Sequence, residues 1–374
     1  MSYAKNSNGP SASTTFFSPD YVSARAQFRE KVKAAGGRLE PLELGAKGPN
    51  GESLTIDIAW FGPEKPRRVF VHSSGLHGVE AFAGSAIQLQ WLKQGIPPIP
   101  EGTAIVLVHV VNPYGMAWLR RFNENNVDLS RNFLAPDEKF AGAPETYRKL
   151  NGFLNPTTPP SRDLFYLRAA WPLVRYRMAE LRQAIAGGQY ANPKGLFFGG
   201  QRLEEGPTKL QGYMADHLAG VERIVAIDIH TGLGRFAEDC LLMDAAPERV
   251  DVNHRMRAVF GERVQLLDSY GVAYEVRGAI YNMYYRVSPT TQVYFAAQEF
   301  GTYNPARIVK ALRAENRWHH YGAGTTDHPT KTELQEVFNP GDSRWRRLVL
   351  QRGREVINQS VELAFEKSRS SGAS

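Results

Sequence analysis

The sequence predicts an α/β protein: a three-layer α/β/α sandwich with a mixed, mainly parallel sheet. The apolar run RRVFVH, residues 67–72, soon gives way to a helical pattern that ends at Leu92. The run TAIVLVHVVNP, residues 103–113, is nearly all apolar, which is typical of a central strand covered on both faces. A helix expected at 208–218 precedes the strand RIVAIDIH, residues 223–230. Strands and helices that alternate in this way build a sheet between helical layers.

Length and composition favour one elaborated domain. A chain of 374 residues with 42% hydrophobic and 22% charged residues can bury a large core and does not have a disordered composition. We expect a single domain at 17–366 with an insertion at about 135–206. Flexible tails are expected at 1–16, which is rich in Ser, Asn, Gly and Thr, and at 367–374.

The charge pattern and the cysteine count indicate the expected surroundings of the protein. The net charge is +7, but Lys and Arg are spread along the chain, so a basic surface is favoured over nucleic-acid binding. The single cysteine, Cys240, permits neither an intrachain disulfide nor a Cys-based zinc site. With no signal-peptide pattern and no long apolar run, we expect a cytoplasmic protein without membrane contacts. The sequence leaves the oligomeric state open.

The N-terminal third predicts a helix, two strands and then the central strand-to-helix turn. Residues 21–35 carry apolar residues among charges and end at a glycine pair, which is typical of a helix with a glycine stop. Residues 42–60 alternate between glycine-rich turns and predict antiparallel edge strands. The turn within 69–92 connects a buried strand to a helix, and such turns lie at the ligand-binding edge of open α/β sheets.

The rest of the chain predicts a loop, the insertion and further strands. Residues 114–133 contain three arginines and several amides without regular periodicity, as expected of a functional loop or of a solvated connection. The insertion at 135–206 contains a predicted helix at 163–185, and we expect the insertion to lie over one rim of the sheet or to act as a small lid. Further elements are the strands CLLMD (240–244), VQLLD (264–268) and TQVYFAAQEF (291–300) and a basic amphipathic helix at 344–366.

Three predicted strand ends carry residues that suit a zinc site. His77 and Glu80 follow the first buried strand, His230 ends a second, and Glu299 lies near the end of a third. Two histidines and one carboxylate form a zinc site with an open position for water, whose pKa falls toward ~7. Glu299 is the candidate general base. HxxE also occurs by chance, so the prediction depends on the strand ends converging.

Neighbouring residues suggest further roles. Asp228 points to the same strand face as His230, where it could orient that histidine or cap a loop. Arg121 and Arg131 could stabilise an oxyanion and hold a carboxylate, or could be surface arginines. The segment TGLGRFA resembles a dinucleotide fingerprint, but the expected βαβ unit does not follow it, so we discount a nucleotide site.

These motifs resemble the zinc metallocarboxypeptidases of the carboxypeptidase A type, over roughly residues 17–366. The similarity is closest to an uncharacterised microbial branch, a domain of unknown function related to succinylglutamate desuccinylase and aspartoacylase. The motifs in order are His77-Gly78-Val79-Glu80, then Arg121 with Val127-Asp128-Leu129-Ser130-Arg131-Asn132-Phe133, then Asp228-Ile229-His230, and finally Glu299 in AAQEFGT.

The resemblance implies a phosphorylase/hydrolase-like fold, one Zn²⁺ per chain and defined residue roles. His77, Glu80 and His230 would bind the metal, Glu299 and Arg121 would be catalytic, and the substrate would contact a set that comprises Arg131, Ser130, Asn132 and Tyr281. Ser130 departs from the family, which has asparagine at that position, and a serine hydroxyl reaches less far. Tyr284 and Tyr285 compete with Tyr281 for the role of the tyrosine that covers the substrate.

The function expected from these residues is hydrolysis of an amide bond. The leading hypothesis is a metallocarboxypeptidase that removes a C-terminal residue from a small peptide. One alternative is a zinc-dependent deacylase of N-acyl amino acids, which is aspartoacylase-like. The other is a binding protein that keeps the fold without turnover; its signature would be a missing ligand or base, and the sequence has both.

Overall fold

The computed structural model describes residues 14–161, 163–177, 180–181, 183–184, 187–244, 249–266 and 277–367. The parts of the predicted tails at 1–13 and 368–374 therefore lie outside the described residues. The end of the predicted strand at 267–268 and several positions of the predicted helix at 163–185 lie outside them as well. Thr14–Phe16, within the expected N-terminal tail, form a short 3-10 helix, η1.

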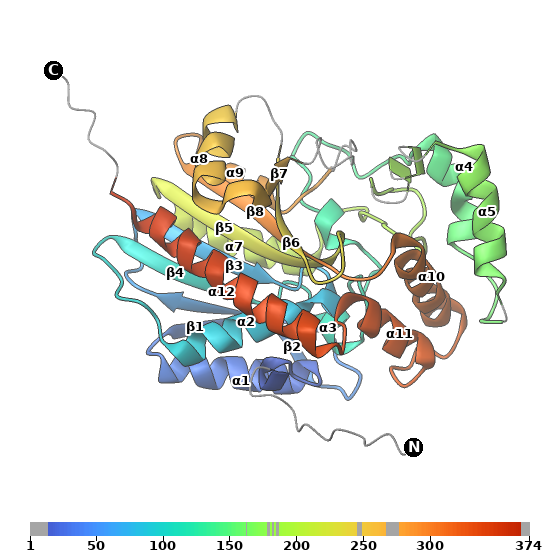
Figure 1. Cartoon of the computed structure of the whole chain (residues 1–374), viewed down its shortest axis with the longest axis horizontal. Coiled ribbons are helices and arrows are strands. Elements are labelled where there is room, and N and C mark those ends of the chain that lie inside the picture. Colours follow the sequence, from blue (N-terminus) through green and yellow to red (C-terminus); the bar gives the residue numbers. More distant parts are fainter. Residues whose placement is uncertain are drawn as a thin grey trace, which may run out of the picture.

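Among the described residues, eight strands form one sheet in the order β1-β2-β4-β3-β5-β8-β6-β7 (Figure 1). The strands are β1 (Arg38–Lys47), β2 (Ser53–Phe61), β3 (Arg68–Ser74), β4 (Thr103–His109), β5 (Arg223–Gly232), β6 (Asp239–Met243), β7 (Val264–Leu266) and β8 (Gln292–Gly301). The central strands β4, β3, β5 and β8 are parallel, as are β6 and β7, whereas β1–β2, β2–β4 and β6–β8 pair antiparallel. The predicted mixed, mainly parallel sheet is confirmed.

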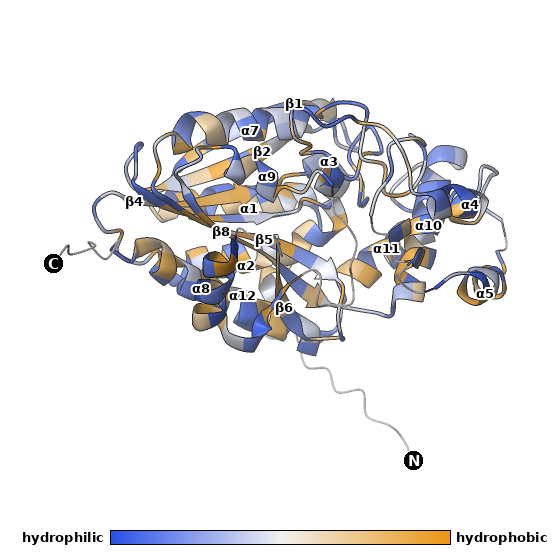
Figure 2. Ribbon diagram, turned by 90° about the horizontal axis from the view of Figure 1, so that it is seen from above, coloured by the Kyte–Doolittle hydropathy of each residue, from blue (hydrophilic) through white to orange (hydrophobic). Residues whose placement is uncertain are grey.

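Helices cover both faces of this sheet (Figure 2). The helices of the described residues are α1 (Tyr21–Ala34), α2 (Ala81–Gln94), α3 (Pro113–Ala117), α4 (Glu145–Leu154), α5 (Phe165–Arg175), α7 (Glu205–Leu218), α8 (Val250–Phe260), α9 (Tyr281–Tyr285), α10 (Pro305–Tyr321), α11 (Pro329–Phe338) and α12 (Ser343–Phe365). Short 3-10 helices follow η1 at η2 (Gly78–Glu80), η3 (Leu129–Arg131) and η5 (Gly261–Arg263).

Side chains alternate between the two faces and so divide the core. Phe70 and Ile227 point to the face covered by α1, α2, α8 and α12, where they share a cluster with Trp345. Val71 and Ala226, one residue away on the same strands, pack with Met214 of α7 and with α9 on the other face. This period of two along strands buried on both faces explains why the runs are apolar throughout.

Two of the predicted elements differ from the structure. β1 is an edge strand as predicted, but β2 is not, because it pairs with β4 on its other side. The helix predicted at 163–185 is interrupted, because Tyr176 takes up extended backbone with φ −121° and ψ 150°; α5 ends at Arg175, and the described residues at 180–181 and 183–184 are helical again.

Part of the predicted insertion lies beside the sheet. Its helices α4 and α5 lie next to α10, at the end of the sheet where α11 also lies (Figure 1). Arg317 of α10 ties the insertion down, because its guanidinium donates to the carbonyl oxygens of Thr158 and Pro159, each at 2.7 Å. These helices form one wall of the cavity described below.

Candidate metal centre

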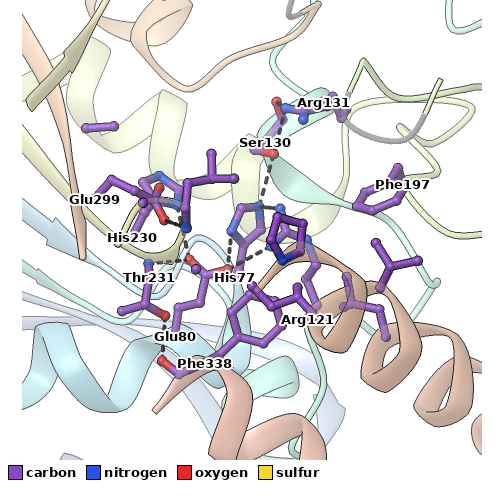
Figure 3. A pocket seen from close by; sticks show the side chains of 18 of the residues that line it. His77, Glu80, Arg121, Ser130, Arg131, Phe197, His230, Thr231, Glu299 and Phe338 are labelled. Atoms are coloured by element: carbon purple, nitrogen blue, oxygen red, sulfur yellow. Dashed lines mark hydrogen bonds and ion pairs between the residues drawn. The ribbon is translucent and has the colours of Figure 1, made fainter. Parts of the chain in front are cut away.

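His77, Glu80 and His230 meet at the carboxyl edge of the parallel strands (Figure 3). One ligand atom of each lies within 4.8 Å of the others, and all three residues are buried. The two carboxylate oxygens of Glu80 lie 2.9 Å from His77 Nδ1 and 3.3 Å from His230 Nδ1. The turn after β3 and the strand β5 therefore bring together ligands that are 150 residues apart.

Each histidine is held by a carboxylate on the nitrogen that faces away from Glu80. His77 Nε2 lies 3.0 Å from Asp128 Oδ1, and His230 Nε2 lies 2.7 Å from Asp228 Oδ2. His77 Nδ1 is buried and makes no aligned hydrogen bond within the described structure. A histidine with one nitrogen on a carboxylate and the other directed at a shared centre is typical of metal ligands. The residues thus fit a metal ion. The contact of Asp228 favours its orienting role over the loop cap.

A glycine allows the metal-binding turn to approach the next loop closely. A Cβ atom built on Gly78 would lie 2.0 Å from the carbonyl carbon of Gly115, so a side chain has no room there. The amides of Gly78 and Val79 donate to the carbonyl oxygens of Arg121 and Arg120, at 3.2 and 2.9 Å. This contact fixes the HxxE turn against the segment that carries Arg121.

Arg121 lies directly beside the proposed ligands. Its Nη1 donates to Glu80 Oε1 at 2.7 Å, and its Nη2 lies 2.8 Å from His77 Nε2. The guanidinium is enclosed by the rings of Phe197 and Phe338, with centroids at 5.9 and 5.8 Å (Figure 3). Burial lowers the pKa of Arg121, but the charges of Asp128 and Glu80 raise it above its usual value. The site therefore contains a permanent positive charge.

Two carboxylates at the centre, those of Glu80 and Asp128, remain ionised. Burial would raise the pKa of Glu80, but the charges of His77 and Arg121 lower it well below its usual range. Asp128 behaves in the same way, since Arg121 and His77 outweigh the effect of its burial on its pKa. An ionised carboxylate is the form that binds a metal ion.

Glu299 lies on β8 directly opposite His230 of β5. Its Oε1 accepts a hydrogen bond from the Leu233 amide at 2.8 Å, and its side chain lines the same cavity as the three ligand residues. Burial raises the pKa of Glu299 to about 7. A carboxyl group with such a pKa can both accept and release a proton near neutral pH.

Two of the predicted substrate contacts, Arg131 and Ser130, lie at the cavity and share one hydrogen-bond network. Arg131 and Ser130 both line the cavity, and Arg131 Nη1 donates to Ser130 Oγ at 2.9 Å. Ser130 Oγ also donates to Asp128 Oδ1 at 2.6 Å and lies 3.0 Å from His77 Nε2. The serine hydroxyl thus connects Arg131 to the carboxylate that holds a proposed metal ligand.

The other two predicted contacts differ in position. Tyr281 lines the cavity, where its ring packs on Phe295 at 5.6 Å, whereas Tyr284 and Tyr285 are not among the lining residues. Asn132 does not line the cavity either: its amide donates to the carbonyl oxygens of Gly199 and Arg202, and its Oδ1 accepts from the Glu204 amide. This placement differs from the expected substrate contact, because all polar atoms of the side chain hold the loop together.

Three residues of the site were not singled out from the sequence. Asp128 orients His77, and its position two residues before Ser130, where its Oδ1 accepts from the Ser130 amide, is a turn pattern that a sequence can show. Phe197 and Phe338 carry no such pattern, because aromatic residues are also the usual choice for a core.

The site opens into one cavity of about 660 Å³, which extends from the metal-binding residues to the insertion. This volume lies in the range of small-molecule sites. None of the helices in the described part of the chain combines the length and the hydropathy that a membrane crossing requires.

The fold is that of the metallocarboxypeptidases, which confirms the predicted resemblance. Carboxypeptidase A from Helicoverpa armigera matches with a TM-score of 0.50 at 15% identity, over 96% of this chain and 78% of that chain. A succinylglutamate desuccinylase from Silicibacter sp. TM1040 matches at 0.39 with 12% identity, over 76% of this chain and 67% of that chain. A metallo-carboxypeptidase from Pseudomonas aeruginosa matches at 0.42 with 14% identity, over 91% and 68%.

The chain itself belongs to the family described as "Protein of unknown function (DUF2817)", whose model matches residues 17–352. No curated protein matches this chain.

Proposed function

We propose that this protein is a zinc-dependent hydrolase that cleaves an amide bond next to a free carboxylate, as a carboxypeptidase does when it removes a C-terminal residue. One observation carries the proposal. The Nδ1 atoms of two histidines face the same carboxylate, Glu80, while other carboxylates hold their Nε2 atoms, at 3.0 Å for His77 and 2.7 Å for His230.

The donor set favours zinc. Two imidazole nitrogens and one carboxylate, from His77, His230 and Glu80, form a set that zinc binds in hydrolases with an open coordination position. When bound, a zinc ion supplies Lewis-acid chemistry there, because it polarises a carbonyl group and makes a water molecule more acidic.

Two residues of this chain would then act on the reacting atoms. Glu299 faces the cavity with a pKa near 7, so it takes a proton from water and passes it to the leaving nitrogen. Arg121 keeps its positive charge beside Glu80 and His77, where it stabilises negative charge that develops on the carbonyl oxygen.

Arg131 would bind the carboxylate of the substrate. It lines the same cavity, and its Nη1 is positioned by hydrogen bonds of 2.9 Å to the Ser130 carbonyl and hydroxyl oxygens. A guanidinium group binds a carboxylate well, because it can donate two parallel hydrogen bonds to the two carboxylate oxygens. Tyr281 lies in the cavity wall as a further substrate contact.

A deacylase of N-acyl amino acids is the second candidate, because residues of α4 and α5 line one side of the cavity and leave room for a small substrate. The scissile bond is the same in both cases, since an N-acyl amino acid also places an amide next to a free carboxylate. One solved structure of similar fold is a succinylglutamate desuccinylase, which by its name is an enzyme of this kind.

Glu299→Gln tests the proposal, because it keeps the shape of the side chain and removes its base. Zinc content should stay at the wild-type level, while kcat on a peptide and N-acyl amino acid panel should fall about 10²–10⁴-fold. Glu262→Gln, at an exposed glutamate, is the matched control and should keep full activity. A fully active Glu299→Gln protein would place the base elsewhere.

A further inference from the structure

The cavity has a polar part and an apolar part. Its charged residues are those of the metal centre together with Arg131 and Asp244, whereas every residue that α4, α5 and α10 contribute is apolar. These residues, named here the apolar wall, are Leu150, Phe153 and Leu154 of α4, Phe165, Ala169, Pro172 and Leu173 of α5, and Pro305, Ala306, Ile308, Val309 and Leu312 of α10.

Contacts among α4, α5 and α10 hold the apolar wall in place. Leu150 and Leu154 are almost fully buried and form a cluster of their own with neighbouring residues of the insertion. The rings of Phe153 and Phe165 stack at 5.5 Å and join α4 to α5. Arg317 ties α10 to the carbonyl groups between these helices. The wall therefore keeps a hydrophobic surface in the same cavity as the reacting centre.

We propose that the acyl side of the substrate is a long hydrocarbon chain that lies along the apolar wall, so that the substrate is an N-acyl amino acid with a fatty acyl group. This inference rests on the proposed function. The amide lies at the metal centre and the carboxylate of the amino acid lies on Arg131. Water adds to the carbonyl carbon, the C–N bond breaks, the proton taken up by Glu299 goes to the nitrogen, and a fatty acid and an amino acid are released.

The chemistry of the wall favours a hydrocarbon over a peptide. Each residue of a peptide has an N–H and a C=O group that need hydrogen-bond partners once they leave water. The wall offers only apolar side chains on its three helices, so a peptide bound there would lose those partners. A hydrocarbon chain has no such requirement and gains from burial.

A chain-length series tests the inference on the zinc-loaded full chain. One amino acid is supplied as its N-acetyl, N-hexanoyl and N-dodecanoyl derivatives, beside a peptide with the same C-terminal residue. We expect kcat/KM to rise about two- to fourfold per added methylene, since a fully buried CH₂ contributes about fourfold. Hydrolysis without this increase would overturn the inference alone, whereas no hydrolysis of any substrate would overturn the proposed function as well.

A pair of adjacent alanines in α5 provides the matched variants. Ala169 lines the cavity and Ala170 is exposed. Ala169→Trp should lower kcat/KM for the N-dodecanoyl substrate at least tenfold and leave the N-acetyl substrate unchanged, while Ala170→Trp should change neither.

Binding of dodecanoate, measured by calorimetry, gives a readout that does not depend on turnover. The wild-type protein and Ala170→Trp should bind it, and Ala169→Trp should bind it at least tenfold more weakly. Failure of the wild-type protein to bind dodecanoate would contradict the inference even if the variants do not fold.

Discussion

Asp128 connects three parts of the proposed metal centre. Its Oδ1 lies 3.0 Å from His77 Nε2 and accepts from the Ser130 hydroxyl, while its Oδ2 lies 3.3 Å from Arg121 Nε. A single carboxylate thus orients a proposed metal ligand and a candidate catalytic arginine. Because the charges of Arg121 and His77 hold the pKa of Asp128 well below its usual range, this carboxylate is ionised at neutral pH.

Asp128→Asn should therefore weaken zinc binding about 10–100-fold, which is the usual cost of losing a carboxylate partner of a metal-bound histidine. Competition with a chelator measures the zinc affinity. Asp251→Asn, at an exposed aspartate, controls for a general change of charge. An unchanged zinc affinity in Asp128→Asn would show that Asp128 does not support His77.

The sequence indicates a functional residue most clearly when that residue lies at the end of a predicted strand. His77, Glu80 and His230 could be proposed as ligands because they lie at or just after the ends of strands that the topology brings to one edge. Asn132 shows the limit of this reasoning, because the motif does not reveal that its amide is used by backbone groups.

Among the elements, α10 and α11 are held to the loop of Arg120 by a buried ion cluster. Glu315 Oε1 lies 2.9 Å from Arg120 Nε and 2.7 Å from Lys331 Nζ, and all three side chains are fully buried. Arg120 precedes Arg121, so the cluster also fixes the segment that reaches the metal centre. Burial would raise the pKa of Glu315, but Arg120 and Lys331 lower it to about 2.

Glu315→Ala should destabilise the protein by about 3–5 kcal/mol, because two cations would stay buried without their partner. Urea unfolding at pH 7 measures the loss. Glu333→Ala removes a more exposed partner of Arg307 between the same two helices and should cost no more than about 1 kcal/mol. Since the folded pKa of Glu315 is depressed, its contribution is full above about pH 4.5 and is lost as the pH falls toward 2. Equal losses in the two variants would refute the role of the cluster.

The same helix shows why some elements could not be predicted. α10 buries Arg313, Glu315, Asn316 and Arg317, so polar residues interrupt the apolar period by which a helix is recognised. By contrast, α12 and the buried strands have regular patterns, and the structure has them close to the predicted positions.

For the whole molecule, the alternation of strands and helices was sufficient to predict the fold class but not the strand order. β8 lies between β5 and β6 in the sheet, although a long segment of the chain separates β8 from both of them. Pairing over such a distance leaves no local signal in the sequence. This order places Glu299 opposite His230 and so completes the site. The cavity wall likewise depends on contacts between the insertion and α10, which lie far apart in the chain.

The central claim is that His77, Glu80 and His230 form one zinc site, and zinc content tests it most directly. The purified wild-type protein and Glu299→Gln, loaded with zinc and freed of excess metal, should each hold about one ion per chain. Glu80→Ala should lose most of it, because it removes the only carboxylate of the three residues. A Glu80→Ala protein that keeps a full equivalent of zinc would contradict the account.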